Sequence, residues 1–252
     1  MITPDGPRRA APTVLGFCLL AALHLALAAP MRGPMLFGDE TAYLGIARFL
    51  AGHTPYPIMA SPAMGAVPFY HFGYPLLLVP VSWLSGDPLT VYRTALAVNS
   101  LLLAALFPLL AAFGRRVLGL APGEAALAGM VVSLYPAFLL QSNLTWSESL
   151  LAPLVAAVLL AFYRLAERPA AGTACAFGLA TVFADAVHAR MLGLVLLALL
   201  AFGLLWKRGR LRSREAATAA LVTLAGAGAV RAVNGLVAAK LWVGDPRRLK
   251  VS

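Results

Sequence analysis

The sequence has few charged residues and few cysteines for its length. Asp, Glu, Lys and Arg make up only 12% of its 252 residues, whereas about 25% is usual in soluble domains. So few charges cannot cover a water-facing surface, which argues against a soluble globular domain and against a disordered chain. The two cysteines, Cys18 and Cys175, both lie within apolar runs. This placement argues against a disulfide scaffold and favours packing over metal binding.

Apolar residues, in contrast, are abundant. They make up 61% of the chain, and the mean hydropathy is +0.82. They form long continuous runs rather than the short alternating segments of a membrane barrel, which predicts an all-α integral membrane protein. The first run also fits a cleaved signal peptide, but the many apolar runs after it favour a retained span. We expect seven crossings, at Thr13–Ala29, Leu89–Phe113, Ala121–Leu140, Ser149–Tyr163, Ala171–Ala186, Met191–Trp206 and Ala216–Trp242.

The basic residues indicate an orientation. Lys and Arg outnumber Asp and Glu by 20 to 10; such an excess occurs in nucleic-acid-binding proteins, but basic residues at the ends of apolar runs are typical of cytoplasmic loops. With a cytoplasmic N-terminus, the inner segments hold eleven basic residues and the outer loops before the last span hold four. The inner ones are Arg8, Arg9, Arg115, Arg116, Arg164, Arg168, Lys207, Arg208, Arg210, Arg212 and Arg214, and the outer ones are Arg32, Arg48, Arg93 and Arg190.

Residues 30–88 form a long extracytoplasmic loop in this orientation. The apolar run of this loop, Tyr74–Leu84, contains Pro75 and Pro80 and is short for a crossing, which needs about 20 residues. We therefore expect a re-entrant or interfacial helix, since a crossing here would also abolish the charge bias. The sequence shows no repeat and no second domain, so residues 1–252 are predicted to form one membrane module.

Acidic residues gather on the predicted outer side. Asp39, Glu40, Asp87, Glu148 and Asp185 all lie in outer loops or at outer ends of spans. Acidic groups near a membrane are costly unless they are solvated or used. The pattern therefore predicts a site that opens outward.

The first two of these acids begin a segment, residues 38–52, that is predicted to be a helix lying on the outer surface. Asp39 fits a helix N-cap, Gly52 fits a left-handed C-terminal residue, and residues such as Leu44 supply an apolar side. A purely structural role is the alternative, with Asp39 as the cap and Glu40 as a favourable first-turn charge.

Within this segment, Asp39 and Glu40 are followed by Tyr43, Ile46, Arg48, Leu50 and Gly52. This motif resembles the first extracytoplasmic loop of GT-C glycosyltransferases, in particular the lipid A aminoarabinose transferases and the protein O-mannosyltransferases. These integral membrane enzymes take a sugar from a polyprenyl-phosphate carrier. The predicted topology is similar as well, with one span, a long outer loop bearing an acidic pair, and then further spans. The resemblance covers the N-terminal seven-span module of such enzymes.

The resemblance implies catalytic roles for three acids. Asp39 matches a general base that takes the proton of the acceptor as the acceptor attacks the anomeric carbon. Glu40 matches a second acid that holds the acceptor, a metal or the helix frame, and Glu148 matches a further outer acid. For Glu148 a structural alternative stays open, in which Ser147 caps a helix and Glu148 is a first-turn charge.

The resemblance also implies residues that bind the substrate. Arg190, just before a span, matches an arginine whose fork of donors holds the carrier phosphate; pairing with a lipid phosphate or with Asp185 is the alternative. Arg93 begins another span at the outer face. The remaining substrate-binding candidates are His71 and Tyr74, in the aromatic stretch Phe69–Pro75, and Tyr43 in the motif.

One charge lies inside a predicted span. Arg231 and Asn234 fall within the last apolar run, and a charge at the bilayer centre costs at least about 2.5–3.5 kcal/mol. Either Arg231 faces a polar environment or the span ends before it.

The resemblance therefore implies an inverting glycosyltransferase, which we expect in a bacterial plasma membrane. It moves a sugar from a polyprenyl-phosphate carrier to a lipid, glycan or protein acceptor at the outer face. Phosphate-loop and dinucleotide-binding motifs are absent from the sequence, which argues against a nucleotide-dependent enzyme; no cofactor is predicted, and a divalent metal is left open. No nucleic-acid partner is expected. The alternatives are a GT-C module without turnover of its own, acting as a lipid-binding scaffold or beside a second membrane subunit, and a small transporter, against which the outer acids in loops argue.

Overall fold

The described part of the chain is built from helices. The computed structural model describes residues 7–34, 38–53 and 70–241, and these ranges contain no strand. Side chains are described there except at 7–11 and 239–241. The predictions for the Arg8 and Arg9 side chains therefore lie outside what is described, as do those for Phe69 and Trp242. The helices are α1 (Pro7–Ala28), α2 (Gly38–Leu50), α3 (Gly73–Leu84), α4 (Pro88–Arg116), α5 (Pro122–Ser133), α6 (Pro136–Gln141), α7 (Glu148–Glu167), α8 (Ala171–Val187), the short 3₁₀ helix η4 (Ala189–Met191), α9 (Leu192–Lys207) and α10 (Ser213–Leu241).

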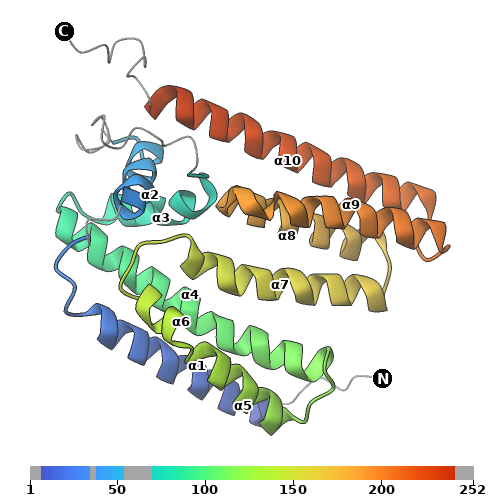
Figure 1. Cartoon of the computed structure of the whole chain (residues 1–252), viewed down its shortest axis with the longest axis horizontal. Helices are drawn as coiled ribbons and strands as arrows, with labels where there is room; N and C mark the ends of the chain where they lie inside the picture. Colours follow the sequence, from blue (N-terminus) through green and yellow to red (C-terminus); the bar gives the residue numbers. More distant parts are fainter. Residues whose placement is uncertain (1–6, 35–37, 54–69, 242–252) are drawn as a thin grey trace.

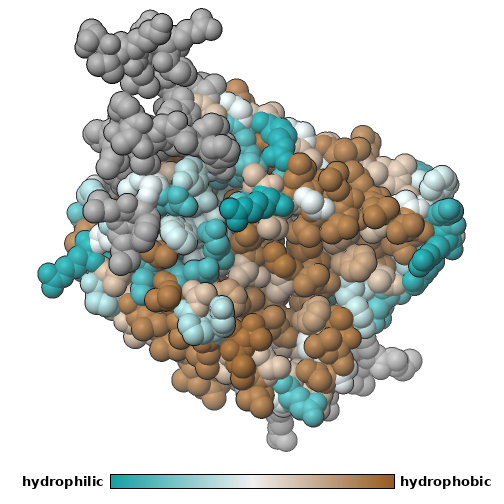
Figure 2. Space-filling model, viewed as in Figure 1, coloured by the Kyte–Doolittle hydropathy of each residue, from teal (hydrophilic) through white to brown (hydrophobic). Residues whose placement is uncertain are grey.

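Several helices are long and apolar enough to span a membrane. Four meet both criteria within the described residues: α4, α7, η4 together with α9, and α10. The apolar parts of α1 and α8 are shorter, and the run predicted at Ala121–Leu140 is divided into α5 and α6 before Pro136, since a proline cannot continue a helix from the preceding turn. The membrane class is thus supported, while seven crossings stay a prediction. Figure 2 shows hydrophobic residues over the middle of the helices and hydrophilic ones toward the ends of the molecule.

The long helices lie roughly side by side, and α2 and α3 sit together at one end of them (Figure 1). Helix α4 packs against α1, α5 and α7, and α8 packs against α7, α9 and α10. Helices α2 and α3 pack against each other, α3 also contacts α4 and α8, and α10 reaches α2. The end that carries α2 and α3 is therefore where segments from both halves of the chain meet.

Local sequence explains how α4 begins and ends. The Asp87 carboxylate accepts a hydrogen bond from the backbone N–H of Thr90 at 2.8 Å, and Pro88 occupies the first turn, where its missing N–H is not needed. Arg115 and Arg116 lie in the last turn, where cations favour the negative end of the helix dipole.

Helix α3 agrees with the expected short helix at residues 74–84. Its 12 residues extend about 18 Å, well below the roughly 30 Å of a bilayer core. Gly73 permits close approach to α8, because a Cβ atom there would lie 2.6 Å from the backbone carbon and oxygen of Ala186. This contact fixes the segment that enters α3.

Helix α2 is more enclosed than the surface helix that we expected. Every side chain from Ala42 to Ala47 is buried, because α3 packs along one side and Val237 of α10 contacts Ile46 on another. The helix begins at Gly38, so Asp39 lies inside the first turn rather than at an N-cap. Gly52 does have the expected positive φ, of 83°.

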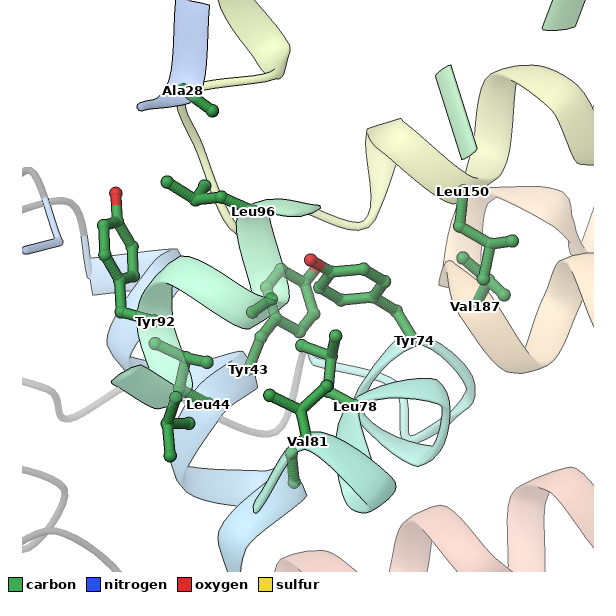
Figure 3. Close-up of a cluster of buried hydrophobic side chains, with 13 residues drawn as sticks. Ala28, Tyr43, Leu44, Tyr74, Leu78, Val81, Tyr92, Leu96, Leu150 and Val187 are labelled. Carbon is green, nitrogen blue, oxygen red and sulfur yellow. The ribbon is translucent and has the colours of Figure 1, made fainter. Parts of the chain in front are cut away.

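A buried apolar cluster holds this end of the molecule together. It draws on α1, α2, α3, α4, α7 and α8, and Figure 3 shows the rings of Tyr43 and Tyr74 next to each other within it. Their centroids are 5.1 Å apart in an edge-to-face arrangement, which contributes about 0.5–1.5 kcal/mol beyond area burial. Tyr74 and Tyr92 are among the largest side chains that are fully buried.

Candidate active site

The first turn of α2 presents two carboxylates in different environments. Asp39 is half-buried, whereas the side chain of Glu40 is completely buried. Successive residues of a helix point about 100° apart, so one acid faces the open side of the helix and the other faces the interior. The two predicted catalytic acids therefore have different surroundings.

Glu40 binds structural groups inside the protein. Its Oε1 atom accepts hydrogen bonds from the backbone N–H of Thr145 at 2.9 Å, the Thr145 hydroxyl at 3.3 Å and the Tyr92 hydroxyl at 3.3 Å. These bonds join α2 to α4 and to the segment that precedes α7. We therefore assign Glu40 to the helix frame, which was one of the roles expected for it, rather than to substrate contact.

The segment before α7 is held by further hydrogen bonds. Asn99 of α4 donates from Nδ2 to the Leu144 carbonyl at 2.6 Å, and Tyr92 donates to the Asn143 carbonyl at 3.2 Å. The Tyr74 hydroxyl in turn donates to Asn99 Oδ1 at 2.9 Å. Tyr74, predicted to bind substrate, is thus fully buried and occupied by this network.

Asp39 is held by a tyrosine from the loop. The Tyr70 hydroxyl donates a hydrogen bond to Asp39 Oδ1, and the Tyr70 ring packs edge-to-face against Tyr43, with centroids 5.1 Å apart. The carboxylate is therefore oriented by a side chain that is itself fixed by an aromatic contact.

A second hydrogen-bonded chain leads from α2 to α7. The Ser147 hydroxyl donates to Glu148 Oε2 at 3.2 Å and lies 2.8 Å from the Tyr43 hydroxyl, which then acts as the donor to Ser147. Ser147 makes no side-chain cap on α7. Tyr43 and Glu148, both predicted site residues, are thus linked through Ser147.

Electrostatic effects show which charges lie within reach of Tyr43. Burial raises the pKa of the Tyr43 hydroxyl, the negative charges of Glu148 and Asp39 raise it further, and the positive charge of Arg190 opposes them. Residues from α2, α7 and η4 therefore act on one hydroxyl.

The same charges act on His188, at the end of α8. Burial lowers the pKa of its ring; Glu148 and Asp39 favour the charged form, while Arg190 and His71 oppose it. Its Nδ1 atom accepts a hydrogen bond from the backbone N–H of Arg190 at 3.2 Å, which requires a deprotonated nitrogen. The charges of Asp39, Glu148 and Arg190 thus act on both Tyr43 and His188, and that of His71 acts on His188; we call these residues the Asp39 cluster.

His71 is a buried link between the loop and α8. Its Nδ1–H donates to the backbone carbonyl of Asp185, and the neighbouring Phe72 N–H donates to Asn234 Oδ1 of α10 at 3.1 Å. These bonds hold in place the segment before α3, which carries Tyr70.

Arg231 lies next to an acidic side chain. Of the two interpretations of the sequence, this favours the one in which Arg231 faces a polar environment over the one in which the span ends before it. Helix α10 continues through it, and its Nη2 atom lies 2.9 Å from Asp185 Oδ1, with the Arg231 side chain 44% exposed and that of Asp185 fully buried. Asp185 thus pairs with Arg231 rather than with His188 or Arg190.

Arg93 is not brought into the cluster. Its Nε donates to the Met31 carbonyl at 3.4 Å, and it lines a separate cavity of about 230 Å³ together with Leu25 and Ala28 of α1. Arg190, in contrast, is exposed on η4 beside His188. The two arginines predicted to bind the carrier phosphate, Arg93 and Arg190, therefore lie in different places.

The described residues contain no group of three or more His, Cys, Asp or Glu side chains that could together hold a metal ion. Asp39 and Glu148 are the carboxylates of the cluster that are not fully buried. In chemical terms, the cluster combines a half-buried carboxylate, a second carboxylate and an exposed guanidinium at one end of the helices.

Sequence reasoning missed several residues of the network. Tyr70 belongs to the aromatic stretch that was noted, but the sequence alone did not connect it with Asp39. Ser147 was considered only as a cap, while Tyr92 and Thr145 carried no signal, since their role depends on the burial of Glu40.

Comparison with known proteins adds no family assignment. No protein-family model matches the chain, and no curated protein matches it.

Proposed function

We propose that this chain is an inverting glycosyltransferase that uses a polyprenyl-phosphate sugar, with Asp39 as the general base. One observation carries the proposal: the charges of Asp39 in α2, Glu148 in α7 and Arg190 in η4, which come from distant parts of the sequence, all act on the Tyr43 hydroxyl and on the His188 ring. A carboxylate and a guanidinium near each other can serve the two ends of a group transfer, namely the acceptor proton and the leaving phosphate. The resemblance of the motif at residues 39–52 to GT-C enzymes supports the same reaction.

The reaction balances with these residues alone. The acceptor hydroxyl gives its proton to Asp39 as its oxygen attacks the anomeric carbon. The bond between the anomeric carbon and the phosphate oxygen breaks, and both electrons leave with the polyprenyl phosphate. Arg190 binds that phosphate through paired N–H donors, and Tyr70 holds the carboxylate in place.

The proposal includes the predicted topology. Helices α1, α4, α5 with α6, α7, α8, α9 and α10 are the seven crossings, the N-terminus is cytoplasmic, and α2, α3 and the Asp39 cluster are extracytoplasmic. The distribution of Lys and Arg supports this orientation. The grouping of α2 and α3 at one end of the long helices agrees with it (Figure 1).

The test uses the purified chain in nanodiscs with a panel of radiolabelled polyprenyl-phosphate sugars. We expect release of label from one donor by the wild type and loss of that release, by at least a hundredfold, in Asp39→Asn. Arg190→Ala raises the KM for the same donor, because it removes the contact to the phosphate.

Asp87→Asn is the matched control, since Asp87 is an outer acid whose carboxylate only caps α4. It retains the release rate of the wild type. Label release from Asp39→Asn at the wild-type rate contradicts the proposal. No release from any donor favours the alternative of a module that acts with a second membrane subunit.

A further inference from the structure

An apolar groove leads to the polar cluster. It has a volume of about 430 Å³ and lies between α4, the α5–α6 pair and α7, which is within the range of about 300–1,000 Å³ typical of small-molecule sites. Its walls are almost entirely aliphatic, with Phe138 as the aromatic member. The apolar lining includes Leu106 and Leu110 of α4, Phe138 of α6, and Ala152, Val155 and Leu159 of α7.

Two polar side chains line this groove, an amide and a carboxylate. They are the side chains of Gln141, at the end of α6, and Glu148, at the start of α7. Within the described residues, no group donates to the buried side-chain oxygen of Gln141. Because an amide can both donate and accept, the charge of Glu148 decides which head group this end of the groove favours.

Glu148 connects the groove to the Asp39 cluster. It lines the groove, accepts the hydrogen bond from Ser147, and its charge acts on both Tyr43 and His188. A head group held by Glu148 is therefore next to the cluster, while its chain extends along α4 and α7.

The charge of Glu148 selects between two kinds of lipid. A carboxylate at the head of the groove repels a phosphate and attracts a hydroxyl or ammonium donor. The guanidinium that suits a phosphate, Arg190, is on η4 and does not line the groove. We therefore expect two lipid positions, one at Glu148 for a head group with a donor and one at Arg190 for a phosphate.

We propose that this groove holds the apolar chain of a lipid acceptor whose head bears a hydroxyl or ammonium group. The inference rests on the proposed function and narrows it, because it selects a lipid from among lipid, glycan and protein acceptors. The acceptor head donates to Glu148, and the carrier phosphate lies on the side of Arg190.

Photo-crosslinking in nanodiscs tests the groove directly. The probes are a long-chain alcohol and a long-chain amine, each with a diazirine in the chain, and an alkyl phosphate with the same chain. Crosslinked peptides are mapped by mass spectrometry. We expect the alcohol or the amine to label α4 and α7 at least fivefold more than the phosphate does; which of the two labels more identifies the donor head.

Variants separate the groove from general lipid contact. Ala152→Trp fills the groove and lowers labelling at least fivefold; Val155→Phe, a smaller change, serves if Ala152→Trp does not fold. Leu196→Trp, on an exposed site of α9, leaves labelling unchanged, and Glu148→Gln lowers the preference over the phosphate. Equal labelling by all three probes indicates an ordinary bilayer chain and overturns the inference, as does labelling that persists in a folded groove-filling variant.

Cleavage of the sugar donor in the absence of acceptor distinguishes a failure of the transferase proposal from a failure of the acceptor-groove proposal. Asp39-dependent release of sugar to water in the same nanodiscs tests only the transferase. Release without head-group preference overturns the acceptor groove alone. Preference without release from any donor leaves a selective lipid groove and overturns the transferase, and with it the acceptor role of the lipid.

Discussion

The hydroxyl of Tyr70 donates a hydrogen bond to the carboxylate of Asp39, although the two residues are separated by 31 positions in the sequence. The Tyr70 ring is fixed in turn by its edge-to-face contact with Tyr43. Burial and the bond to Asp39 both raise the pKa of the Tyr70 hydroxyl, so this hydroxyl stays protonated and acts as a donor at neutral pH. Tyr70 is therefore a positioning residue for the proposed base.

Tyr70→Phe removes this hydrogen bond while keeping the ring. A hydrogen bond to a charged group contributes about 1.5–3 kcal/mol, so we expect kcat for sugar release to fall about tenfold to a hundredfold. The KM for the donor stays within about twofold, because the phosphate contact at Arg190 is intact. Steady-state kinetics in nanodiscs measures both constants. Tyr135→Phe, at an exposed tyrosine packed against Phe138, is the control with unchanged kinetics; a Tyr70→Phe enzyme with a normal kcat contradicts the positioning role.

Glu40 is expected to affect stability before it affects chemistry. Glu40→Ala leaves the Thr145 N–H without its buried acceptor, whereas the Tyr92 hydroxyl keeps the Asn143 carbonyl. The free energy of unfolding should fall by about 1–3 kcal/mol, the cost of one buried group without a partner. Glu40→Gln should lose less, because its amide oxygen can still accept. Denaturant unfolding in mixed micelles measures both changes.

A matched control for Glu40 is Glu124→Ala. Glu124 is an exposed carboxylate that accepts a hydrogen bond from the Ala121 N–H at the start of α5, so its loss costs only about 1 kcal/mol. If Glu40→Ala were as stable as the wild type and lost sugar transfer, Glu40 would contact substrate rather than the helix frame.

Periodicity and composition suffice for the long helices but not for the environment of α2. The apolar runs predict α4, α7, α9 and α10 closely, because burial in a membrane is a property of a whole run. The burial of residues 42–47 could not be predicted, because it depends on what α3 and α10 place against the helix. That information lies in segments far away in the sequence.

The candidate site, too, could be predicted from the sequence only in part. Its acids were found from their position in outer loops, but their separate roles were not. Glu40 and Asp39 are adjacent in sequence, and only the helical geometry sends one inward to Thr145 and the other toward Tyr70. The position of Arg93 at the predicted outer end of a span did not reveal where its side chain points. It points toward the Met31 carbonyl.

The ion pair between α8 and α10 gives an asymmetric prediction. Arg231→Ala leaves the fully buried Asp185 carboxylate without its partner, which costs about 3 kcal/mol or more. Asp185→Asn costs less, because the half-exposed Arg231 can be solvated. The double variant Asp185→Asn with Arg231→Ala should recover part of the loss, as measured by thermal unfolding in detergent. Arg210→Ala, which removes an exposed arginine bonded to the Ala166 carbonyl, serves as the control. Equal losses of stability in Arg231→Ala and Asp185→Asn would contradict the larger cost of leaving the buried carboxylate without its partner.

The protonation of His188 predicts how stability depends on pH. Burial lowers the pKa of this ring in the folded protein below the ordinary value of a histidine. Between the folded and the unfolded pKa, the unfolded chain therefore binds more protons than the folded one, and stability rises with pH. The contribution of His188 is therefore complete above about pH 6.5 and is lost as the pH falls through the folded value, where protonated Nδ1 can no longer accept from the Arg190 N–H. His188→Asn should flatten the curve of Tm against pH in this interval, whereas His53→Asn, at an exposed histidine after α2, should leave its shape unchanged. A curve for His188→Asn that is parallel to the wild type would show that His188 does not link protonation to the position of Arg190.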